Sequence, residues 1–579
     1  MTRPRWANSE VDWVQSAALA LLLVFALAAG LGLGNDWLWG HNGYNGAAFS
    51  QAARNTLRFA EIGQAQYWTA PTPPPSEIIY AHHPLLLHLH VAVMFVLFGE
   101  HEWAARLVPA IYSVLSAAML YFLVRRLWGS RVAVVALFVF VCLPIDLIYA
   151  NMVDHEQGSI FWSLVMLHHY LRLRETGARR NLWGLLAATF MACQFDWPPY
   201  YIAFFLFLHA LVGGLRRHPV KLRQTAEFSF LVVFGAFVLV NFFGYFLWIF
   251  LKMGSLRNMV DSFVSRSASP DDIWSQTLTR LPDMFPALVL SLAAFWLISF
   301  LVRLGRGQSQ MRDLLPLSYF LAQTVHQAVF KEAGYLHVYW FYHAAPFVSV
   351  ASGIALVASA RFVTNFRAFD DSASPSGVRR LLVAAALGAI LLSLFVAGVR
   401  GMAWARPLEG SPYAHKGQQN QDLVYVARWL GEHTARDQAI LFHESLPVRI
   451  EVVWYFDRVH ALVPDLDLDE LPAVIGPCEP AYYVLDIAEA PPEAYQGFLR
   501  EGRPATLMNG HLLAINLSTL SDTEALNESL ELVQEEPTLW STYWKSPWGA
   551  RAHWVSEPTG IDVLARLRTI DSSPTGPSP

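Results

Sequence analysis

The chain has 579 residues, of which 54% are hydrophobic and only 15% are charged, and its mean hydropathy is +0.32. This composition excludes an ordinary soluble protein and indicates a polytopic membrane protein. The net charge of -5, with Lys and Arg confined to short clusters between apolar segments, offers no basic face for nucleic acid.

Long apolar runs predict about 11 membrane-spanning helices before residue 400, because about 20 apolar residues cross a bilayer once. The expected spans are 14–34, 103–124, 131–150, 157–171, 181–195, 199–214, 226–250, 283–304, 313–330, 340–360 and 381–399. The first run follows Arg3 and Arg5 as in a signal peptide, but its length and the spans after it favour an uncleaved first span.

The apolar run Pro84–Gly99 is treated differently, because as a helix it would reach only about 24 Å across a hydrocarbon core of about 30 Å. It also contains His88 and His90. Counting it as a span would invert every later loop and place the Arg clusters outside. We interpret it as an interfacial or re-entrant helix on the outer side.

The Arg clusters orient the chain. With the N-terminus in the cytoplasm, nearly all of them fall in cytoplasmic loops, as the positive-inside rule requires. The outer loops are then 35–102, 151–156, 196–198, 251–282 and 331–339, and everything after residue 400 is also outside. We therefore expect a multi-pass protein of the plasma (inner) membrane, with a cytoplasmic N-terminus and an extracytoplasmic C-terminal domain.

The character of the sequence changes after residue 400. "QDLVYVARWLGEH" (421–433) is typical of an amphipathic helix, whereas "QAILFHES" (438–445), "AYYVLDIA" (481–488) and "HLLAINL" (511–517) favour strands. The predicted fold is thus a polytopic α-helical membrane domain, 1–400, followed by a soluble α/β domain, 401–570. The outer loop 35–102 carries juxtamembrane helices such as "AARNTLRF" (52–59), and the tail 571–579 and the inner loop 370–377 are expected to be disordered.

Carboxylates in the outer loops are candidate catalytic groups. Asp154 and Glu156 precede a span, where they either begin a hydrated helix at its positive end or include a general base with a raised pKa. The first loop, "NDWLWGHNGYNG", adds Asp36, His41 and Asn45. Because all these residues face one compartment, the sequence predicts a polar site at the outer membrane surface.

Basic and aromatic groups face the same side. His82 and His83 in "YAHHP" either anchor the loop at the interface or recognise an anion. Lys331 breaks the positive-inside bias, which indicates a specific anionic partner. A phosphate beside the aromatic residues that include Tyr335 and His337 fits this pattern.

Two further interpretations concern a metal ion and Asp196. His82 and His83, with His41 and Glu156, could bind a divalent metal, but their spacing matches no standard zinc signature, so no cofactor is assigned. Asp196 in "QFDWPPYY" is interpreted as a capped, hydrated turn before two prolines.

Several motifs in order resemble a known family. "YAHHP" (80–84), "FGEHEWAARLVP" (98–109), "LVRRLWGSR" (123–131), "HEQGSIFW" (155–162) and a late Lys…Tyr loop are similar to motifs of the GT-C membrane glycosyltransferases. The similarity extends over roughly residues 10–400 and is greatest to glycosyltransferase family 39. That family contains polyprenyl-phosphate-sugar-dependent protein mannosyltransferases and bacterial lipid A aminoarabinose transferases.

The resemblance implies inverting transfer of one sugar from a polyprenyl-phosphate carrier to an acceptor at the outer face. The acceptor could be a protein, lipid A or another glycolipid, or a polysaccharide. It also implies that Glu156, rather than Asp154, is the acid that opens the fourth span. Lys331 and Tyr335 then fall in a phosphate-binding loop, and the paired histidines occupy a position where the family often has a basic residue.

The chain departs from the family in the first loop. The family's Asp-Glu pair falls on Asn45 and Gly46, and an Asn side chain cannot serve as a base. Either His41 or Asp36 replaces it, or Glu156 acts alone.

The competing functions are a transporter or flippase for lipid-linked sugars and a non-catalytic binder of them. Transporters tend to carry inverted repeats and paired broken helices near the bilayer midplane. Here the ionisable residues gather on one side of the membrane, which favours the enzyme.

Overall fold

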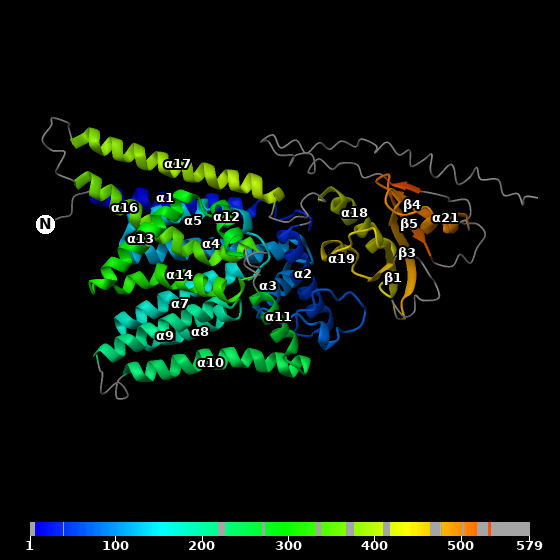
Figure 1. Ribbon diagram of the computed structural model, residues 1–579, viewed down its shortest axis with the longest axis horizontal. Coiled ribbons are helices and arrows are strands. Elements are labelled where there is room, and N and C mark those ends of the chain that lie inside the picture. The colour runs from blue at the N-terminus through cyan, green and yellow to red at the C-terminus, as the bar shows by residue number, and fades with distance from the viewer. Residues whose placement is uncertain are drawn as a thin grey trace, which may run out of the picture. The chain divides into compact units, whose positions relative to one another are not determined.

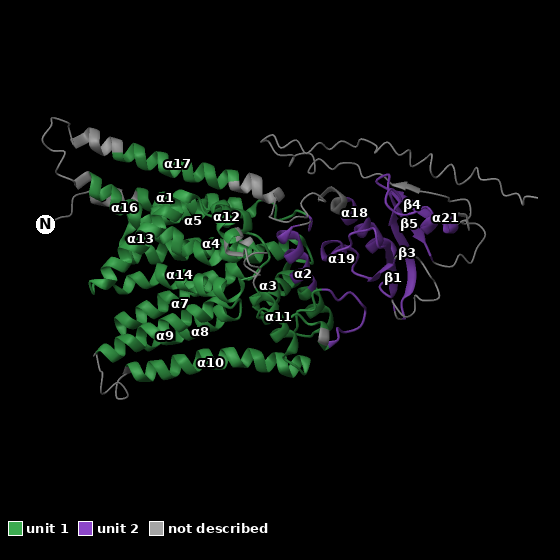
Figure 2. Cartoon of the chain, in the orientation of Figure 1, with its two compact units in different colours: residues 1–35, 52–66, 76–411 green, residues 36–51, 67–75, 412–579 purple. Residues whose placement is uncertain are grey.

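The computed structural model describes residues 6–38, 40–217, 226–268, 273–331, 337–365, 376–408, 417–463, 475, 477–500, 503–517 and 531–533. The predicted tail 571–579, most of the loop 370–377, and Tyr335 lie outside these ranges. The chain forms two compact units, coloured separately in Figure 2. One contains residues 1–35, 52–66 and 76–411, and the other contains residues 36–51, 67–75 and 412–579. We call them the membrane unit and the α/β unit.

The membrane unit is helical (Figure 1). Its helices are α1 (Trp6–Gly30), α3 (Leu86–Phe98), α4 (Glu102–Trp128), α5 (Ser130–Cys142), α6 (Pro144–Tyr149), α7 (Glu156–Thr176), α8 (Arg179–Cys193), α9 (Pro198–Arg217), α10 (Ala226–Met253), α11 (Arg257–Ser267), α12 (Ile273–Met284), α13 (Ala287–Gly305), α14 (Leu314–Val329), α16 (Ala345–Asn365) and α17 (Ser376–Leu408). Short 3-10 turns are η1 (Ser76–Ile78), η3 (Met311–Asp313) and η4 (Val338–Ala344). Helix α2 (His41–Phe59) begins in the α/β unit and ends in the membrane unit.

In the described part of the chain, seven helices are long and apolar enough to cross a membrane. They are α1, α4, α9, α10, α13, α17 and the helix that continues from η4 through α16. Each span expected from the sequence corresponds to a helix, although 131–150 is divided into α5 and α6 at Pro144, which lacks the N–H that a continuous helix needs. The run 84–99 forms α3, which is about 20 Å long.

Close helix packing builds the interior of the membrane unit. One cluster of buried apolar residues extends through α4, α5, α7 and α16. Gly353 of α16 lies against α5, and a Cβ at this position would come within 2.9 Å of Ala136. Small residues of this kind allow membrane helices to approach closely, which holds the loops that follow them in fixed positions.

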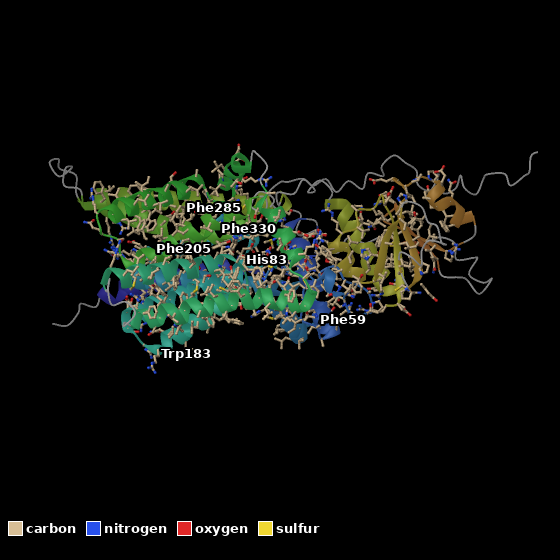
Figure 3. All side chains as sticks on the ribbon, turned by 60° about the horizontal axis from the view of Figure 1, so that its bottom comes forward. Phe59, His83, Trp183, Phe205, Phe285 and Phe330 are labelled. Atoms are coloured by element: carbon tan, nitrogen blue, oxygen red, sulfur yellow. The ribbon has the colours of Figure 1, made fainter. Side chains whose placement is uncertain are left out.

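The two ends of the membrane unit differ chemically. At one end the Arg clusters make ion pairs: Arg126 with Glu175, Arg174 with Glu227 (2.7 Å) and Arg303 with Asp313 (3.0 Å). Trp183, near the start of α8, points away from the unit at a distance from His83 (Figure 3). The loops at the other end carry the histidines and acids considered below. The loop 251–282, predicted only as an outer loop, contains α11 and most of α12.

The α/β unit contains a six-stranded mixed sheet in the order β2-β1-β3-β5-β4-β6. The strands are β1 (Gln438–His443), β2 (Val459–Val463), β3 (Glu479–Asp486), β4 (Ala505–Met508), β5 (Leu512–Asn516) and β6 (Glu531–Val533). Strand β1 is parallel to β2 and β3, whereas β5 is antiparallel to β3 and β4. The described part of the unit also contains helices α18 (Gly417–His433), α19 (Ile450–Phe456) and α21 (Glu493–Arg500). The predicted helix and all three predicted strands correspond to α18, β1, β3 and β5.

Candidate active site

The loop that carries His82 and His83 is held by its main chain. Gln64 Nε2 donates to the carbonyl oxygen of His83 (2.9 Å), and the Tyr245 hydroxyl lies 2.6 Å from the same oxygen. Trp197 Nε1 donates to the carbonyl oxygen of His82 (2.7 Å). These bonds go to the main chain and not to the imidazole rings. They therefore hold the loop in place while both rings can contact other groups in fixed directions.

His83 contacts a buried carboxylate. Its Nδ1 lies 3.2 Å from Asp196 Oδ1, and the two residues are 8% and 3% exposed. The ring of His155 stacks on His83 at 4.6 Å with an interplanar angle of 11°. Asp196 Oδ1 also accepts the backbone N–H of the next residue, Trp197 (2.8 Å), so its side chain bonds within the turn before α9. The predicted hydrated surroundings are wrong, since Asp196 is buried among imidazoles.

The second oxygen of Asp196 faces another histidine. Asp196 Oδ2 is 4.0 Å from His343 Nε2, which lies 2.6 Å from the Ser159 hydroxyl of α7. Gly158 makes this approach feasible, because a Cβ at that position would overlap the ring of Phe195. The glycine in "HEQGS" therefore lets the turn before α9 pack against the first turn of α7.

Arg266, from α11, connects the two histidines of the loop. Its guanidinium lies 3.4 Å from His83 Nε2 and 3.3 Å from His82 Nδ1. An arginine can only donate, so both imidazole nitrogens must be acceptors. His83 then carries its proton on Nδ1, toward Asp196, and His82 carries its proton on Nε2, which lies 2.9 Å from Asn258 Oδ1. Both rings are neutral.

The same contacts govern titration in this loop. Burial and the positive charge of Arg266 lower the pKa of His82 to about 4. Burial, Arg266 and His82 lower the pKa of His83 well below its usual value. Neither histidine therefore carries a positive charge at neutral pH, and the cation at this position is Arg266.

Arg266 keeps its charge available. It also contacts the Tyr80 hydroxyl (3.3 Å), and its guanidinium lies over the ring of Trp340 at 5.9 Å. Within the described ranges its partners are neutral groups and no carboxylate forms an ion pair with it. The sequence offered the same signal as for Lys331, namely a cation in an outer loop, but Arg266 was not singled out.

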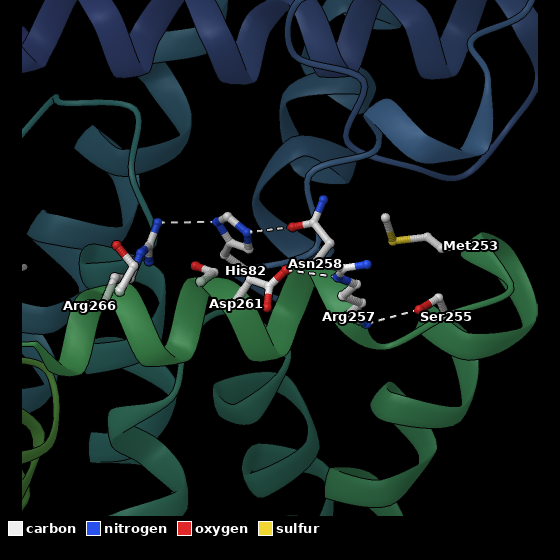
Figure 4. A pocket seen from close by; sticks show the side chains of 9 residues that line it. His82, Met253, Ser255, Arg257, Asn258, Asp261 and Arg266 are labelled. Atoms are coloured by element: carbon white, nitrogen blue, oxygen red, sulfur yellow. Dashed lines mark hydrogen bonds and ion pairs between the residues drawn. The ribbon is translucent and has the colours of Figure 1, made fainter.

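Arg266 also borders an open pocket of about 720 Å³ (Figure 4). The remaining lining comes from His82, from Met253 and Ser255, and from the polar face of α11. Figure 4 shows His82 between Asn258 and Arg266, with hydrogen bonds to both. An anion that enters this pocket can therefore reach Arg266.

Glu156 and Asp154 lie beside this cluster. Glu156 is the first residue of α7 and is 5% exposed, and its Oε2 has no hydrogen-bond partner in the described chain. Asp154 is 6% exposed and its Oδ1 accepts the N–H of His155 (2.8 Å). A carboxyl buried without a cation favours its protonated form, so this pair can hold a proton at the site.

The late loop adds aromatic and basic groups. His337 stacks on Trp340 (6.0 Å, 29°), which is the ring beneath Arg266, so His337 borders the cluster. His326 of α14 also packs against Trp340, with 4.7 Å between the two ring centroids. Lys331 is half-buried at the end of α14, and the structure records no partner for it among the described residues. Its predicted companion Tyr335 lies outside those residues.

The first-loop candidates belong to the α/β unit. Asp36 is ion-paired with Arg428, which makes it a poor base. His41 begins α2, and Asn45 lies one turn later and is 8% exposed. A Cβ at Gly46 would overlap the ring of Trp37, so the position where the family has Glu has no room for a side chain here.

A metal centre was the remaining possibility. In the part of the chain that the structure describes, no group of three or more His, Cys, Asp or Glu side chains is arranged to hold a metal ion.

The architecture is shared with solved structures. A helical membrane unit with its polar loops gathered at one end, followed by an α/β unit, is the GT-C fold predicted from the sequence. The structure matches ArnT from Cupriavidus metallidurans bound to undecaprenyl phosphate with a TM-score of 0.55 and 15% identity, covering 89% of this chain and 99% of that chain. It matches archaeal AglB from Archaeoglobus fulgidus, in complex with an inhibitory peptide and a dolichol-phosphate, with a TM-score of 0.50 and 15% identity, covering 83% and 70%.

The sequence itself carries a family signal. Residues 82–248 match the family model described as dolichyl-phosphate-mannose-protein mannosyltransferase. This segment contains His82, His83, Glu156 and Asp196 and ends before Arg266. No curated protein matches the chain in sequence. The fold and the family model together confirm the resemblance to GT-C membrane glycosyltransferases of the family 39 type.

Proposed function

We propose that the protein is an integral membrane glycosyltransferase that moves a single sugar from a polyprenyl-phosphate donor to an acceptor at the extracytoplasmic face, with inversion at the sugar carbon. The observation that carries this proposal is the Arg266–His83–Asp196 arrangement. A cation that meets only neutral partners in the described chain stands on one side of a buried imidazole, and a buried carboxylate stands on the other.

The donor phosphate binds at Arg266 in this proposal. A guanidinium offers several N–H donors in one plane, which suits phosphate oxygens, and the neighbouring His82 and Asn258 offer further polar contacts. Lys331 and Tyr335, from the late loop, add contacts to the same phosphate. These groups stabilise the negative charge that develops on the phosphate as the bond to the sugar breaks.

The acceptor is activated on the side of His83 opposite Arg266. Its oxygen or nitrogen attacks the sugar carbon while the bond from that carbon to the phosphate oxygen breaks, so the products are polyprenyl phosphate and the glycosylated acceptor. The acceptor proton passes to a carboxylate, and Glu156 and Asp196 are the candidates in the membrane unit. His41 is the first-loop alternative. Burial of both carboxyls keeps water from competing with the acceptor.

A transfer assay in proteoliposomes tests the proposal. The purified protein is given polyprenyl-phosphate mannose or polyprenyl-phosphate aminoarabinose with candidate acceptors, with EDTA or added Mn²⁺ to test the divalent ion. Release of polyprenyl phosphate that is lost in Glu156→Gln, and retained in Glu175→Gln at the Arg-rich end, supports the enzyme. Movement of the carrier across the bilayer without release supports a flippase, and binding without either supports a non-catalytic binder.

Cysteine labelling tests the membrane face. Ser265 is exposed on α11, and Ser309 is exposed between α13 and α14 at the Arg-rich end. In a Cys478→Ser background, Ser265→Cys should react with an impermeant maleimide from the extracytoplasmic side only, and Ser309→Cys from the cytoplasmic side only. The reverse pattern would refute the proposed orientation.

A further inference from the structure

The α/β unit includes the first part of the outer loop, residues 36–51, as well as the C-terminal residues. At the start of this segment Trp37 is fully buried, and its backbone N–H donates to the Tyr455 hydroxyl of α19 (2.7 Å). Its ring packs edge-to-face on Trp454 at 6.1 Å and 89°. Helix α19 therefore fixes the chain where the first loop begins.

The same helix fixes the end of the segment. Gln51 is fully buried, and its Nε2 donates to Asp457 Oδ1 (3.0 Å) and to the carbonyl oxygen of Trp68 (2.8 Å). Asp457 ends α19 with a φ of 47°, and its Oδ2 accepts from Arg436 (2.7 Å). A buried amide bonded to a buried carboxylate is costly to separate, because each would lose its partner away from water.

His41 and Asn45 lie between these two anchors, on the first turns of α2. The helix continues into the membrane unit, where Arg54 pairs with Glu100 (2.6 Å) and Asn55 donates to the carbonyl oxygen of Ala65 (2.8 Å). Both halves of α2 are thus held, the first by α19 and the second by the membrane unit.

We propose that the C-terminal domain is a working part of the transferase: α19 fixes residues 36–51 for the reaction, and Gln51 and Asp457 are positioning residues. This inference rests on the proposed function. In this inference the C-terminal domain positions residues 36–51 and does not merely cover the site. The contact between Gln51 and Asp457 lies outside residues 82–248, the range that the family model matches.

The test compares two equally buried aspartates in the full-length protein. Asp457→Asn keeps the size of the side chain and tolerates the left-handed φ, but it removes the charge that faces Gln51 and Arg436. Asp486→Asn is the control, because Asp486 is 6% exposed against 5% for Asp457 and its Oδ1 accepts the N–H of Ala488 instead. Gln51→Leu removes the donor of the same hydrogen bond. If both variants behave alike, the effect belongs to the contact and not to Asp457 alone.

The first measurement is hydrogen–deuterium exchange of residues 41–51, which needs no substrate. We expect faster exchange in Asp457→Asn and Gln51→Leu and wild-type exchange in Asp486→Asn. The second is the transfer assay, in which a loosened loop should lower kcat by about 10- to 100-fold and leave the donor KM within about twofold, since misplacement acts on the reacting geometry.

Faster exchange with a lower kcat supports the inference. Unchanged exchange in both variants, or faster exchange with unchanged kcat, would overturn it. A wild-type protein that releases no polyprenyl phosphate refutes the proposed function instead, and faster exchange in the variants would then still support the fixing of the loop by α19.

Discussion

Asp196→Asn is the most informative single substitution, because it changes charge with almost no change of shape. The amide oxygen of Asn can still accept from the Trp197 N–H (2.8 Å in the native protein) and from His83 Nδ1 (3.2 Å). The group that replaces Oδ2 faces His343 at 4.0 Å. The turn before α9 should therefore keep its structure while the site loses one buried negative charge.

The size of the effect follows from distance and burial. Two unit charges 4 Å apart interact by about 4 kcal/mol at an effective dielectric constant of 20, which bounds what Asp196 contributes to a proton or a developing positive charge beside it. General base catalysis contributes about 10²- to 10⁴-fold, or about 3 to 5 kcal/mol. We expect Asp196→Asn to lower kcat/KM by about 10²- to 10⁴-fold.

Donor binding should respond differently. Arg266 contacts His83 on the nitrogen opposite Asp196, so the cation remains in place and loses a nearby negative charge. The affinity for polyprenyl phosphate should therefore stay the same or increase.

Single-turnover transfer with a labelled donor and competition binding with polyprenyl phosphate separate the two effects. Asp313→Asn is the matched control, because Asp313 has the same 3% exposure and pairs with Arg303 at the Arg-rich end. Transfer by Asp196→Asn within about threefold of the wild-type rate, where general base catalysis would contribute 10²-fold or more, would exclude Asp196 as the base and leave Glu156 or His41 in that role. So would a loss of donor affinity as large as the loss of rate.

Three further changes test other parts of the structure. Arg266→Lys keeps the charge but loses the planar guanidinium, so the affinity for polyprenyl phosphate should fall about 10- to 100-fold. Single-turnover rates at saturating donor should change less. Equal affinity of variant and wild type in a binding titration would contradict phosphate binding at Arg266. Burial raises the pKa of Glu451 to about 7 from 4.5, so the folded α/β unit binds this proton more tightly than the unfolded chain and loses up to roughly 3 kcal/mol of stability as pH rises from 4.5 to 7. Glu451→Gln should remove this slope in hydrogen exchange of residues 450–463 at pH 5 and pH 8, and an unchanged slope would exclude Glu451 as its source. Gly46→Ala should displace the ring of Trp37 and speed exchange across 41–51, whereas Asn45→Asp should not, and protection equal to wild type in Gly46→Ala would show that the ring can move without cost.

The spans could be predicted because length and apolar composition set them directly. The loop 251–282 was different, since α11 has only 11 residues and its few apolar positions (Met259, Val260, Phe263 and Val264) lie among polar and charged ones, so it is too short and too polar to stand out as a span. Helix α19, "IEVVWYF", consists largely of β-branched and aromatic residues that favour a strand, and packing in the α/β unit overrides that preference. Strands β4 and β6 have only four and three residues, too few for a clear alternation.

The site was predicted in part. His82, His83, Asp154, Glu156 and His337 were singled out from charge and sidedness, and the structure brings the membrane-unit residues to one end of the helices. Asp196 could not be distinguished from an ordinary turn residue by sequence, because the same oxygen that bonds to the turn backbone also contacts His83, which is 113 positions away. The contact between Arg266 and His83 joins residues 183 positions apart, which no local pattern reveals.

The neutral imidazoles around Arg266 leave its positive charge uncancelled. A carboxylate in their place would form an ion pair and cancel the charge, and a lysine would repel the guanidinium. Imidazole nitrogens instead accept its hydrogen bonds at 3.3 and 3.4 Å and leave the positive charge available. These contacts are long and weak, so an anion can replace them at little cost. Because burial and Arg266 lower the pKa of both histidines, both rings stay neutral at neutral pH, and in the proposed function an anion binds Arg266 without a change in their protonation.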